Sequence, residues 1–277
     1  MMKSLFSAEL LKIVKQSKTY YALGAIILIE LLILLIAYYQ GSTVLDLLLE
    51  SLKQSFYFEG SLLNGNLIMY IVLNSLWFNV PLILMIITSG FLTDEYKDGT
   101  LQSVMLQAVR KKQFILVKYA MAILFTILVI TFMMLTTFAF AYAIFGKGDL
   151  IVYINTLNFF ESGDAFRRIC FSFISGAIAM IFYNVTSMTL AILIKDSSKT
   201  WLVSALFLVI TNLLLKVDFG NASFNNLFFP KLIDTWQQLF VYELDWTRII
   251  GNNFLLILYS LLMVLIGTYI FNKKDIG

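Results

Sequence analysis

Six long apolar stretches restrict this chain to one class of fold. Crossing about 30 Å of hydrocarbon takes roughly 20 residues of helix, because each residue advances a helix by about 1.5 Å. The strands of a membrane barrel alternate apolar and polar residues over short segments, and these stretches are too long and continuous for that pattern. The sequence therefore predicts an all-α, polytopic membrane protein in which residues 1–277 form a single domain. Its six transmembrane helices are expected at 20–39, 67–92, 114–145, 169–194, 200–216 and 249–271.

The charge content excludes several classes of protein. Only 13% of the residues are charged and 60% are apolar, whereas about a quarter of the residues in a soluble domain are charged. This excludes an ordinary soluble domain, a disordered chain and a nucleic-acid binder. The chain has no histidine and one cysteine, Cys170, so it offers neither His-dependent nucleophilic catalysis nor the common zinc and haem sites. We expect no catalytic residue, metal ligand or cofactor in this chain, which is not an enzyme by itself.

Lysine and arginine are unevenly distributed over the segments between the spans. With the N-terminus inside, 13 of the 20 basic residues fall on the cytoplasmic side and seven on the outer side, as expected for a multi-pass protein of the cell membrane. Both termini are therefore predicted to be cytoplasmic. The first span is too long for a signal peptide and lacks a small-residue cleavage pattern, so it is expected to be an uncleaved anchor. The strong use of Leu, Ile, Lys, Asn and Phe suggests an AT-rich bacterial genome.

Residues 1–19 precede the first span and are predicted to form an amphipathic helix in the headgroup layer. At 100° per residue one side is apolar and the other polar, and the lysines of the polar side would face anionic lipid. A basic leader that only sets the topology is the alternative. The apolar side comprises Phe6, Leu10, Leu11, Ile13 and Val14, and the polar side comprises Glu9, Lys12, Lys15 and Gln16.

The cytoplasmic connection between the second and third spans contains a short amphipathic helix. Asp98 and Gly99 indicate a turn, and Thr100 can cap the following helix by accepting a hydrogen bond from a backbone N–H. An apolar stripe then recurs with helical spacing. Such a stripe suits docking into a groove of a soluble partner, or it lies on the inner surface of the bilayer, and both interpretations remain open. The stripe consists of Leu101, Val104 and Met105.

The outer segment 217–248 is too apolar for a plain loop. It follows a fifth span of only about 17 residues and contains the runs Leu227-Phe228-Phe229-Pro230 and Trp236-Gln237-Gln238-Leu239-Phe240. A hairpin that dips part-way into the outer leaflet fits this composition if protein or water covers its backbone. An interfacial belt of aromatic residues is the alternative. We predict the re-entrant hairpin.

Several residues within the spans are unusual for a lipid-facing helix. Glu30 lies mid-span, where an acid costs about 2.5–3.5 kcal/mol on insertion scales. It either packs the helices and lines a cavity, in which case Glu30→Gln leaves transport largely intact, or it takes part in transport chemistry. Pro81 is expected to kink the second span because it removes a backbone hydrogen bond. Asn184 belongs to a polar stretch of the fourth span, in which Ser172 and Gly176 permit close helix approach.

One motif match does not indicate an enzyme. Gly146-Lys147-Gly148-Asp149 fits the GxGD string of intramembrane aspartyl proteases. It lies in a predicted outer loop, however, without a membrane-embedded aspartate partner. A short string of this kind is weak evidence outside its structural context.

The order of the segments points to a known family. An amphipathic leader, six spans, a short helix between spans two and three, and an apolar outer hairpin before span six cover nearly the whole chain. Around the short helix an acid precedes Gly-Thr-Leu, and a basic cluster precedes a lysine in span three. These positions are Glu95, Gly99, Thr100, Leu101, Val109 and Lys118. With the closing segment 271–276, this pattern resembles the type-2 ABC exporter permeases (ABC-2 type, also called type V).

The resemblance implies a set of partners and contact residues. Residues 94–107 would be the coupling helix that contacts an ATP-binding cassette ATPase subunit, which would itself bind ATP and Mg, and the leader helix would be a second contact. Glu95 would pair with a basic residue of the ATPase. Spans two and five would line the substrate path and the seam with a second permease subunit, in a homodimer or a heterodimer. The implied ATPase contacts are Asp94, Glu95, Gly99, Thr100, Leu101, Val104 and Met105. The implied inner-interface basic residues are Arg110, Lys111, Lys112 and Lys118, and the candidates for pathway or packing are Glu30, Pro81 and Asn184.

We therefore expect the transmembrane permease subunit of an ATP-driven ABC exporter in the lipid bilayer. Its substrate would be amphiphilic, such as a peptide, a bacteriocin, an antibiotic or a lipid-like molecule, because the sequence lacks a hydrophilic channel signature and a large outer domain. An ATP-independent secondary transporter or channel is one alternative, and would show paired intramembrane charges and related halves. A membrane scaffold subunit, which needs only packing, is the other.

Overall fold

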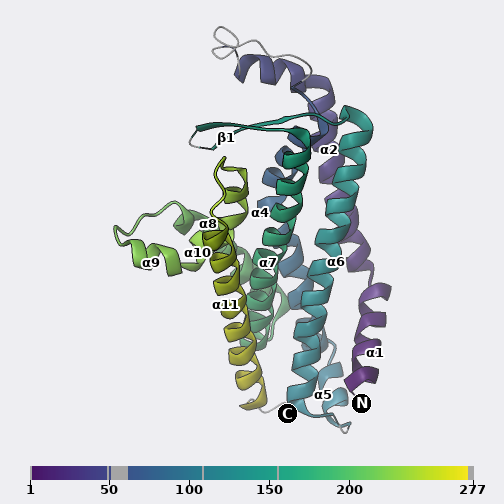
Figure 1. Ribbon diagram of the computed structural model, residues 1–277. Coiled ribbons are helices and arrows are strands. Elements are labelled where there is room, and N and C mark those ends of the chain that lie inside the picture. Colours follow the sequence, from purple (N-terminus) through teal and green to yellow (C-terminus); the bar gives the residue numbers. More distant parts are fainter. Residues whose placement is uncertain (1, 49, 51–61, 108, 155, 274–277) are drawn as a thin grey trace.

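The computed structural model confirms the six long apolar helices (Figure 1). It describes residues 2–48, 50, 62–107, 109–154 and 156–273. By length and composition, all six helices can cross a membrane. The first turn of α1 and the last turn of α11 lie at the same end of the bundle, as expected if both termini are on one side. The six helices are α2 (Ser17–Leu48), α4 (Gly65–Lys97), α6 (Lys111–Phe145), α7 (Ser162–Ile194), α8 (Ser197–Leu215) and α11 (Trp246–Lys273).

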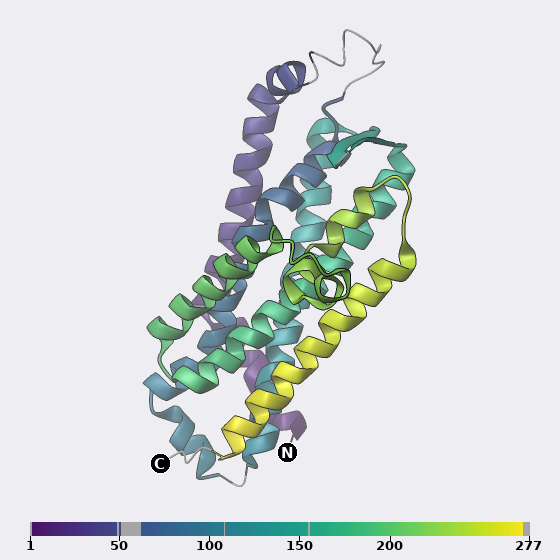
Figure 2. The same ribbon diagram turned by 90° about the vertical axis from the view of Figure 1, so that its left-hand side faces the viewer.

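Helix α7 lies at the centre of the bundle and packs against α4, α6, α8 and α11 (Figure 2). Its small residues make this possible, because they allow neighbouring helices to approach closely. Gly176 faces Trp77 of α4, and a Cβ atom at this position would overlap the indole ring. One turn away, Ser172 donates to the backbone oxygen of Trp236 over 3.4 Å. The close approach predicted for Ser172 and Gly176 is confirmed.

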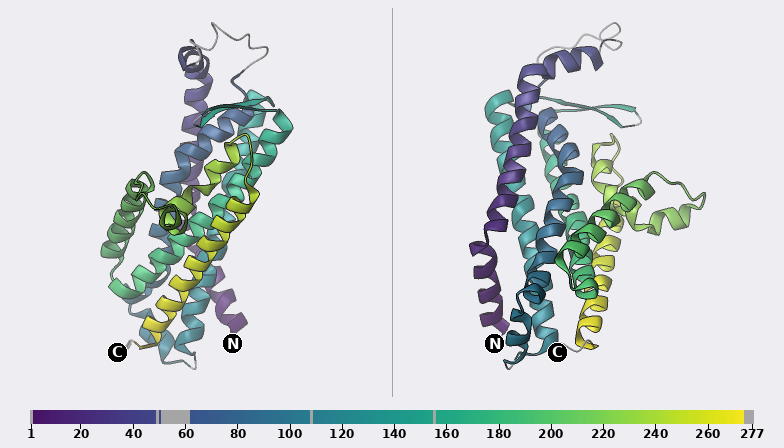
Figure 3. Two further views of the ribbon diagram at one scale, coloured as in Figure 1. Left: turned by 60° about the vertical axis from the view of Figure 1, so that its left-hand side comes forward. Right: turned by 180° about the vertical axis from the view of Figure 1, so that it is seen from behind.

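The N-terminal helix α1 (Met2–Lys15) is separated from α2 by a single residue, Gln16. It stands along the inner half of α6 (Figure 3). The prediction that its polar side faces lipid headgroups is wrong for Glu9 and Lys12, since both form ion pairs with other helices and Glu9 is buried. The side of α1 that is exposed carries Leu11 and Val14 together with Lys3 and Lys15.

The short helix α5 (Thr100–Met105) follows α4 after the predicted turn at Asp98 and Gly99. Gly99 has a φ of 66°, in the left-handed region where residues with a Cβ atom are disfavoured. The predicted capping role of Thr100 is wrong: Gly99 occupies the N-cap position, and no side chain caps this helix. The turn therefore depends on backbone freedom at Gly99.

A two-stranded antiparallel hairpin at the outer end was not predicted. Strand β1 (Leu150–Ile154) pairs with β2 (Thr156–Phe160), with Val152 opposite Asn158. Alternation of buried and exposed residues in β2 reflects its one covered face. Helix α7 begins directly after this hairpin, earlier than predicted, so that Arg167 and Arg168 lie within its first two turns.

Residues Gly146–Asp149, which match the GxGD pattern, connect α6 to this hairpin and form hydrogen bonds with the start of α4. The backbone oxygen of Gly146 accepts a hydrogen bond from the N–H of Gly65 over 2.8 Å, and the oxygen of Asp149 accepts one from Asn64 over 2.7 Å. A Cβ atom on Gly148 would lie 2.7 Å from the Asn64 side chain. Close packing against Asn64 therefore explains Gly148, whereas Gly146 has a φ of 68°, which favours glycine.

The outer segment between α8 and α11 folds back along the bundle. It contains α9 (Ala222–Leu227), α10 (Phe229–Ile233) and the 3₁₀ helix η1 (Asp234–Phe240). In Figures 1 and 3, α9 and α10 lie beside the upper and middle part of α11, below the level of the β hairpin, and η1 returns towards the outer end. This path matches the predicted re-entrant hairpin. Residues 49 and 51–61 of the outer segment 40–66 lie outside the described part of the chain. Residues 274–277 also lie outside it, so that only residues 271–273 of the closing segment 271–276 are described.

Candidate functional site

Four charged side chains join α1, α4 and α6 at the inner end of the bundle. The Lys118 ammonium nitrogen lies 2.7 Å from Glu9 Oε2 and 2.6 Å from Glu95 Oε1. The Lys12 nitrogen lies 2.6 Å from the same Glu95 oxygen. We call these four residues the inner charge cluster.

The inner charge cluster is formally neutral and mostly shielded from solvent. The Lys118 side chain has no exposed surface, and the Glu95 side chain is 4% exposed. Charges removed from water to this extent are tolerated when each has a hydrogen-bonded partner. Burial lowers the pKa of Lys12, but the hydrogen bond to Glu95 and the charges of Glu95, Glu9 and Asp94 outweigh it, so that this pKa is raised. The ion pairs of Lys12 and Lys118 therefore hold the three helices together.

The inner charge cluster is directly connected to α5. Glu95 lies in the last turn of α4, and the adjacent Asp94 forms a second ion pair, 2.7 Å from the Lys18 nitrogen. Only Asp98 and Gly99 separate α4 from α5. A displacement of α5 would thus act on the end of α4 and, through Glu95, on α1 and α6.

The apolar stripe of α5 faces the protein rather than solvent. Leu101 is buried, and Val104 and Met105 pack against the bundle core. The stripe thus packs inward in this arrangement, and its docking into a partner groove stays a prediction. The surface that α5 and the next turn do offer carries Thr100, Gln102, Ser103, Leu106 and Gln107, of which Leu106 is 90% exposed.

The predicted basic residues divide into two groups. Arg110 and Lys112 are exposed at the start of α6, and Lys111 is partly exposed. Lys118 is buried in the inner charge cluster instead of lying at a surface. Glu95, likewise, is paired with two lysines of its own chain. Its predicted pairing with an ATPase residue stays a prediction, and would require one of those ion pairs to open.

Polar side chains also connect the helices within the apolar part of the bundle. The Asn184 amide of α7 donates to the Thr126 hydroxyl of α6 over 2.5 Å, and its oxygen lies 3.4 Å from the Thr88 hydroxyl of α4. Ser187 lies 2.8 Å from Ser204 of α8. Asn184 is fully buried, so its structural role is to join three helices.

Glu30 lies at the contact between α2 and α6. Its Oε1 accepts a hydrogen bond from the Thr137 hydroxyl over 2.9 Å, whereas Oε2 is buried without a hydrogen-bond partner in the described part of the chain. The side chain is fully buried. This placement supplies the packing contact that the sequence suggested, and leaves the transport alternative untested.

Helix α4 carries a polar stripe on its outward face, between α2 and α8 (Figure 3). Asn74 and Ser75 are exposed there, next to Phe78, which is 43% exposed. The Asn74 and Asn79 amide groups donate only to carbonyl oxygens of their own helix. Exposed amides are unfavourable against hydrocarbon, so a stripe of this kind indicates a protein or water neighbour.

Pro81 is buried within α4, which continues on both sides of it.

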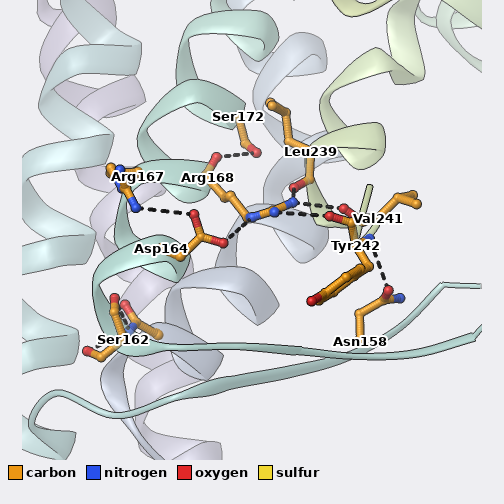
Figure 4. A network of polar contacts seen from close by, with 10 residues as sticks. Asn158, Ser162, Asp164, Arg167, Arg168, Ser172, Leu239, Val241 and Tyr242 are labelled. Atoms are coloured by element: carbon orange, nitrogen blue, oxygen red, sulfur yellow. Dashed lines mark hydrogen bonds and ion pairs between the residues drawn. The ribbon is translucent and has the colours of Figure 1, made fainter. Parts of the chain in front are cut away.

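An arginine at the outer end of α7 fixes the returning segment (Figure 4). The Arg168 guanidinium donates to the backbone oxygens of Leu239, Val241 and Tyr242 over 2.8–3.2 Å. It is oriented by Asp164, 2.6 Å from its Nε. Leu239 lies in the last turn of η1, and Val241 and Tyr242 follow that helix. Arg168 therefore satisfies backbone oxygens at the end of the returning segment, as a re-entrant backbone requires.

The predicted fourth span begins at residue 169, so Arg168 was expected in the outer loop before it and had no predicted role. The Asp164–Arg168 spacing is a helical i,i+4 pair, and this was the signal that could have extended α7 to include it. The η1 carbonyls could not be foreseen, because they come from a segment more than 70 residues later in the sequence.

Comparisons with known proteins do not assign the chain to a family. No protein-family model matches it, and no curated protein matches it. What is established is a multi-span helical membrane protein.

Proposed function

We propose that this chain is the transmembrane permease subunit of an ATP-driven ABC exporter. The observation that carries the proposal is the position of α5. It lies at the inner end of the bundle, exposes Gln102, Ser103 and Leu106, and adjoins a buried charge cluster that joins α1, α4 and α6. A surface at this place suits a soluble partner whose movement must reach the spans.

The mechanism follows from two connections: a short turn joins α5 to α4, and the inner charge cluster joins the end of α4 to α1 and α6. The ATPase partner binds ATP and Mg and supplies the energy, and this chain contributes no catalytic group. Movement of the partner displaces α5 about the turn at Gly99. Because Glu95 is held by Lys12 and Lys118 over 2.6 Å, the end of α4 moves together with α1 and α6 rather than independently. The helices thus respond as a unit.

A second permease subunit is expected against the polar stripe of α4. Asn74, Ser75 and Asn79 lie in the outer half of a membrane-spanning helix, where Asn74 and Ser75 are exposed and Asn79 is half-buried. Covering them with the same stripe of a second copy, or with a polar substrate path, removes the cost of placing amides against lipid. This supports a dimer seam at α4 and α8, with an amphiphilic substrate passing beside it.

The test is affinity purification of the tagged chain from its native membranes, followed by intact mass measurement and an ATPase assay. We expect a stoichiometric soluble subunit with a P-loop and vanadate-sensitive ATP hydrolysis. Leu106→Glu should reduce recovery of that subunit at least tenfold, because it places a charge on the most exposed apolar side chain of the α5 region. Tyr153→Glu is the matched control, since Tyr153 is 75% exposed at the opposite end of the molecule.

Two results would contradict the proposal. A chain recovered alone, or only with membrane proteins and without ATPase activity, would favour the ATP-independent transporter or the scaffold. An ATPase recovered equally with wild type and Leu106→Glu would retain the exporter but remove α5 as its docking surface.

A further inference from the structure

A polar groove opens beside the re-entrant segment, away from α5. It has a volume of about 770 Å³ and lies between the C-terminal end of α8, α10, η1 and the first turn of α11. Gln237 and Gln238 of η1 contribute amide groups to its wall, and Ile154 of the β hairpin borders it. The inner charge cluster and the α4 stripe do not contribute to this lining, so the groove is a separate feature.

The groove presents both signs of charge in equal number. Three basic and three acidic side chains line it, and within the described residues none forms an ion pair with another charged group. Lys231 and Asp234 are half-buried in the groove, whereas Lys216, Glu243, Asp245 and Arg248 are exposed, so only the first two lose hydration without an ion-pair partner. A ligand that carries both signs would supply the missing partners. The six residues are Lys216, Lys231, Arg248, Asp234, Glu243 and Asp245.

Asp234 is the most shielded of these charges. It begins η1, directly after α10. Burial raises its pKa to about 7, although the charge of Lys231 acts in the opposite direction. A cationic group of a ligand next to Asp234 would therefore be stabilised by a carboxylate that has little competing solvent.

Aromatic side chains lie in the part of the outer segment that connects α8 to α10. Phe219 contacts Phe224 and Phe228 with ring centroids 5.1 Å apart in each case. Phe219 and Phe224 are 45% and 49% exposed. Phe219 follows Lys216, which lines the groove, by three positions in the chain, so the aromatic surface belongs to the same outer segment as the groove.

We infer that this groove binds the headgroup of a zwitterionic amphiphile. The ligand carries an ammonium group and a phosphate or carboxylate group on one polar end, and an apolar tail on the other. The acidic side chains of the groove contact the ammonium group, the basic side chains contact the anionic group, and the tail lies along the aromatic surface. The inference goes beyond the proposed function, since it concerns binding by this chain alone and needs no ATPase.

The experiment uses the purified full chain in detergent and three photoreactive probes with the same alkyl tail. They are a zwitterionic lysophosphatidylethanolamine, an anionic lysophosphatidylglycerol and a cationic alkyltrimethylammonium. Binding is measured by concentration-dependent cross-linking, and the labelled peptide is mapped by mass spectrometry. We expect about tenfold tighter binding of the zwitterionic probe, with the label in residues 215–248. Competition by free glycerophosphoethanolamine would identify a soluble zwitterion as sufficient, and competition only by tailed molecules would identify a membrane amphiphile.

Two variants and one control make the result specific. Asp234→Asn and Lys231→Gln each remove one sign of charge and should each weaken binding of the zwitterionic probe about tenfold. Glu161→Gln removes an exposed acid at the start of α7, outside the groove, and should leave binding unchanged. Thermal unfolding checks that all three variants are folded. Equal binding of the three probes, labelling elsewhere in the chain, or wild-type binding by both groove variants would overturn the inference.

Discussion

Replacing Lys118 by methionine tests the inner charge cluster most directly. The substitution keeps most of the apolar stem and removes an ammonium group that has no exposed surface. Glu9 and Glu95 would then share only Lys12, whose side chain is 39% exposed. The four residues would change from net zero charge to one excess negative charge within a buried site.

The expected loss is about 3 kcal/mol of unfolding free energy. Removing one partner of a buried ion pair costs about 3–5 kcal/mol, because the remaining charge is left uncompensated. The lower value applies here since the Glu9 side chain retains 11% exposure and can regain some hydration. The double variant Lys118→Met with Glu9→Gln restores a balanced Lys12–Glu95 pair, and we expect it to recover about 1–2 kcal/mol of that loss.

The assay is unfolding of the purified chain by SDS in mild-detergent micelles, followed by far-UV circular dichroism. Lys112→Met is the matched control: Lys112 is an exposed lysine of the same helix, and its replacement should change stability by less than about 0.5 kcal/mol. If Lys118→Met is as stable as the control, or if the double variant is no more stable than the single one, the four residues do not form the cluster described above.

Three further predictions concern packing, interhelical hydrogen bonds and the outer segment. Gly176→Ala should destabilise the chain by about 1–3 kcal/mol in the same unfolding assay, because the new methyl group overlaps the tryptophan ring of α4; Gly251→Ala, where nothing lies within 4 Å, should have little effect. Thr126→Val removes the acceptor of an interhelical hydrogen bond and should cost about 0.6–1.7 kcal/mol; Thr186→Val, whose hydroxyl bonds only its own helix, should cost less, and equal losses would contradict the shared bond. For Asp234, a folded-state pKa of about 7 lies above its ordinary value of about 3.9, so ionisation opposes folding and stability falls as pH rises between these values. Asp234→Asn should therefore raise the thermal midpoint at pH 8 and leave it unchanged at pH 4. A difference in midpoint that is constant across this pH range would refute the assignment.

Much of the architecture was predictable because hydrophobic length is a local property. All six spans appear where the apolar stretches predicted them, with α2, α4 and α7 longer than expected. The turn at Asp98 and Gly99 was recognisable from two residues, and Gly99 indeed adopts a positive φ. The β hairpin was missed because its two five-residue strands lie between much stronger helical signals.

The charged residues were harder to place than the apolar ones. Glu95 and Lys118 were singled out, but as surface contacts, whereas both are buried. Glu9 was assigned to a lipid-facing side for the same reason: a charge in an amphipathic sequence has solvent as its ordinary partner. The apolar stripe of α5 was consistent with either an inward or an outward face, and only its packing against the core decided between them.

The sequence by itself determined the number of spans, their approximate limits, and the orientation expected from the distribution of lysine and arginine. These follow from the free energy of moving each segment from water to lipid, which is a sum over neighbouring residues. Only the tertiary structure decided which charges neutralise one another and which backbone groups Arg168 satisfies. Those contacts join residues 23 to 109 positions apart in the chain, and they form only because the helices pack in one particular arrangement.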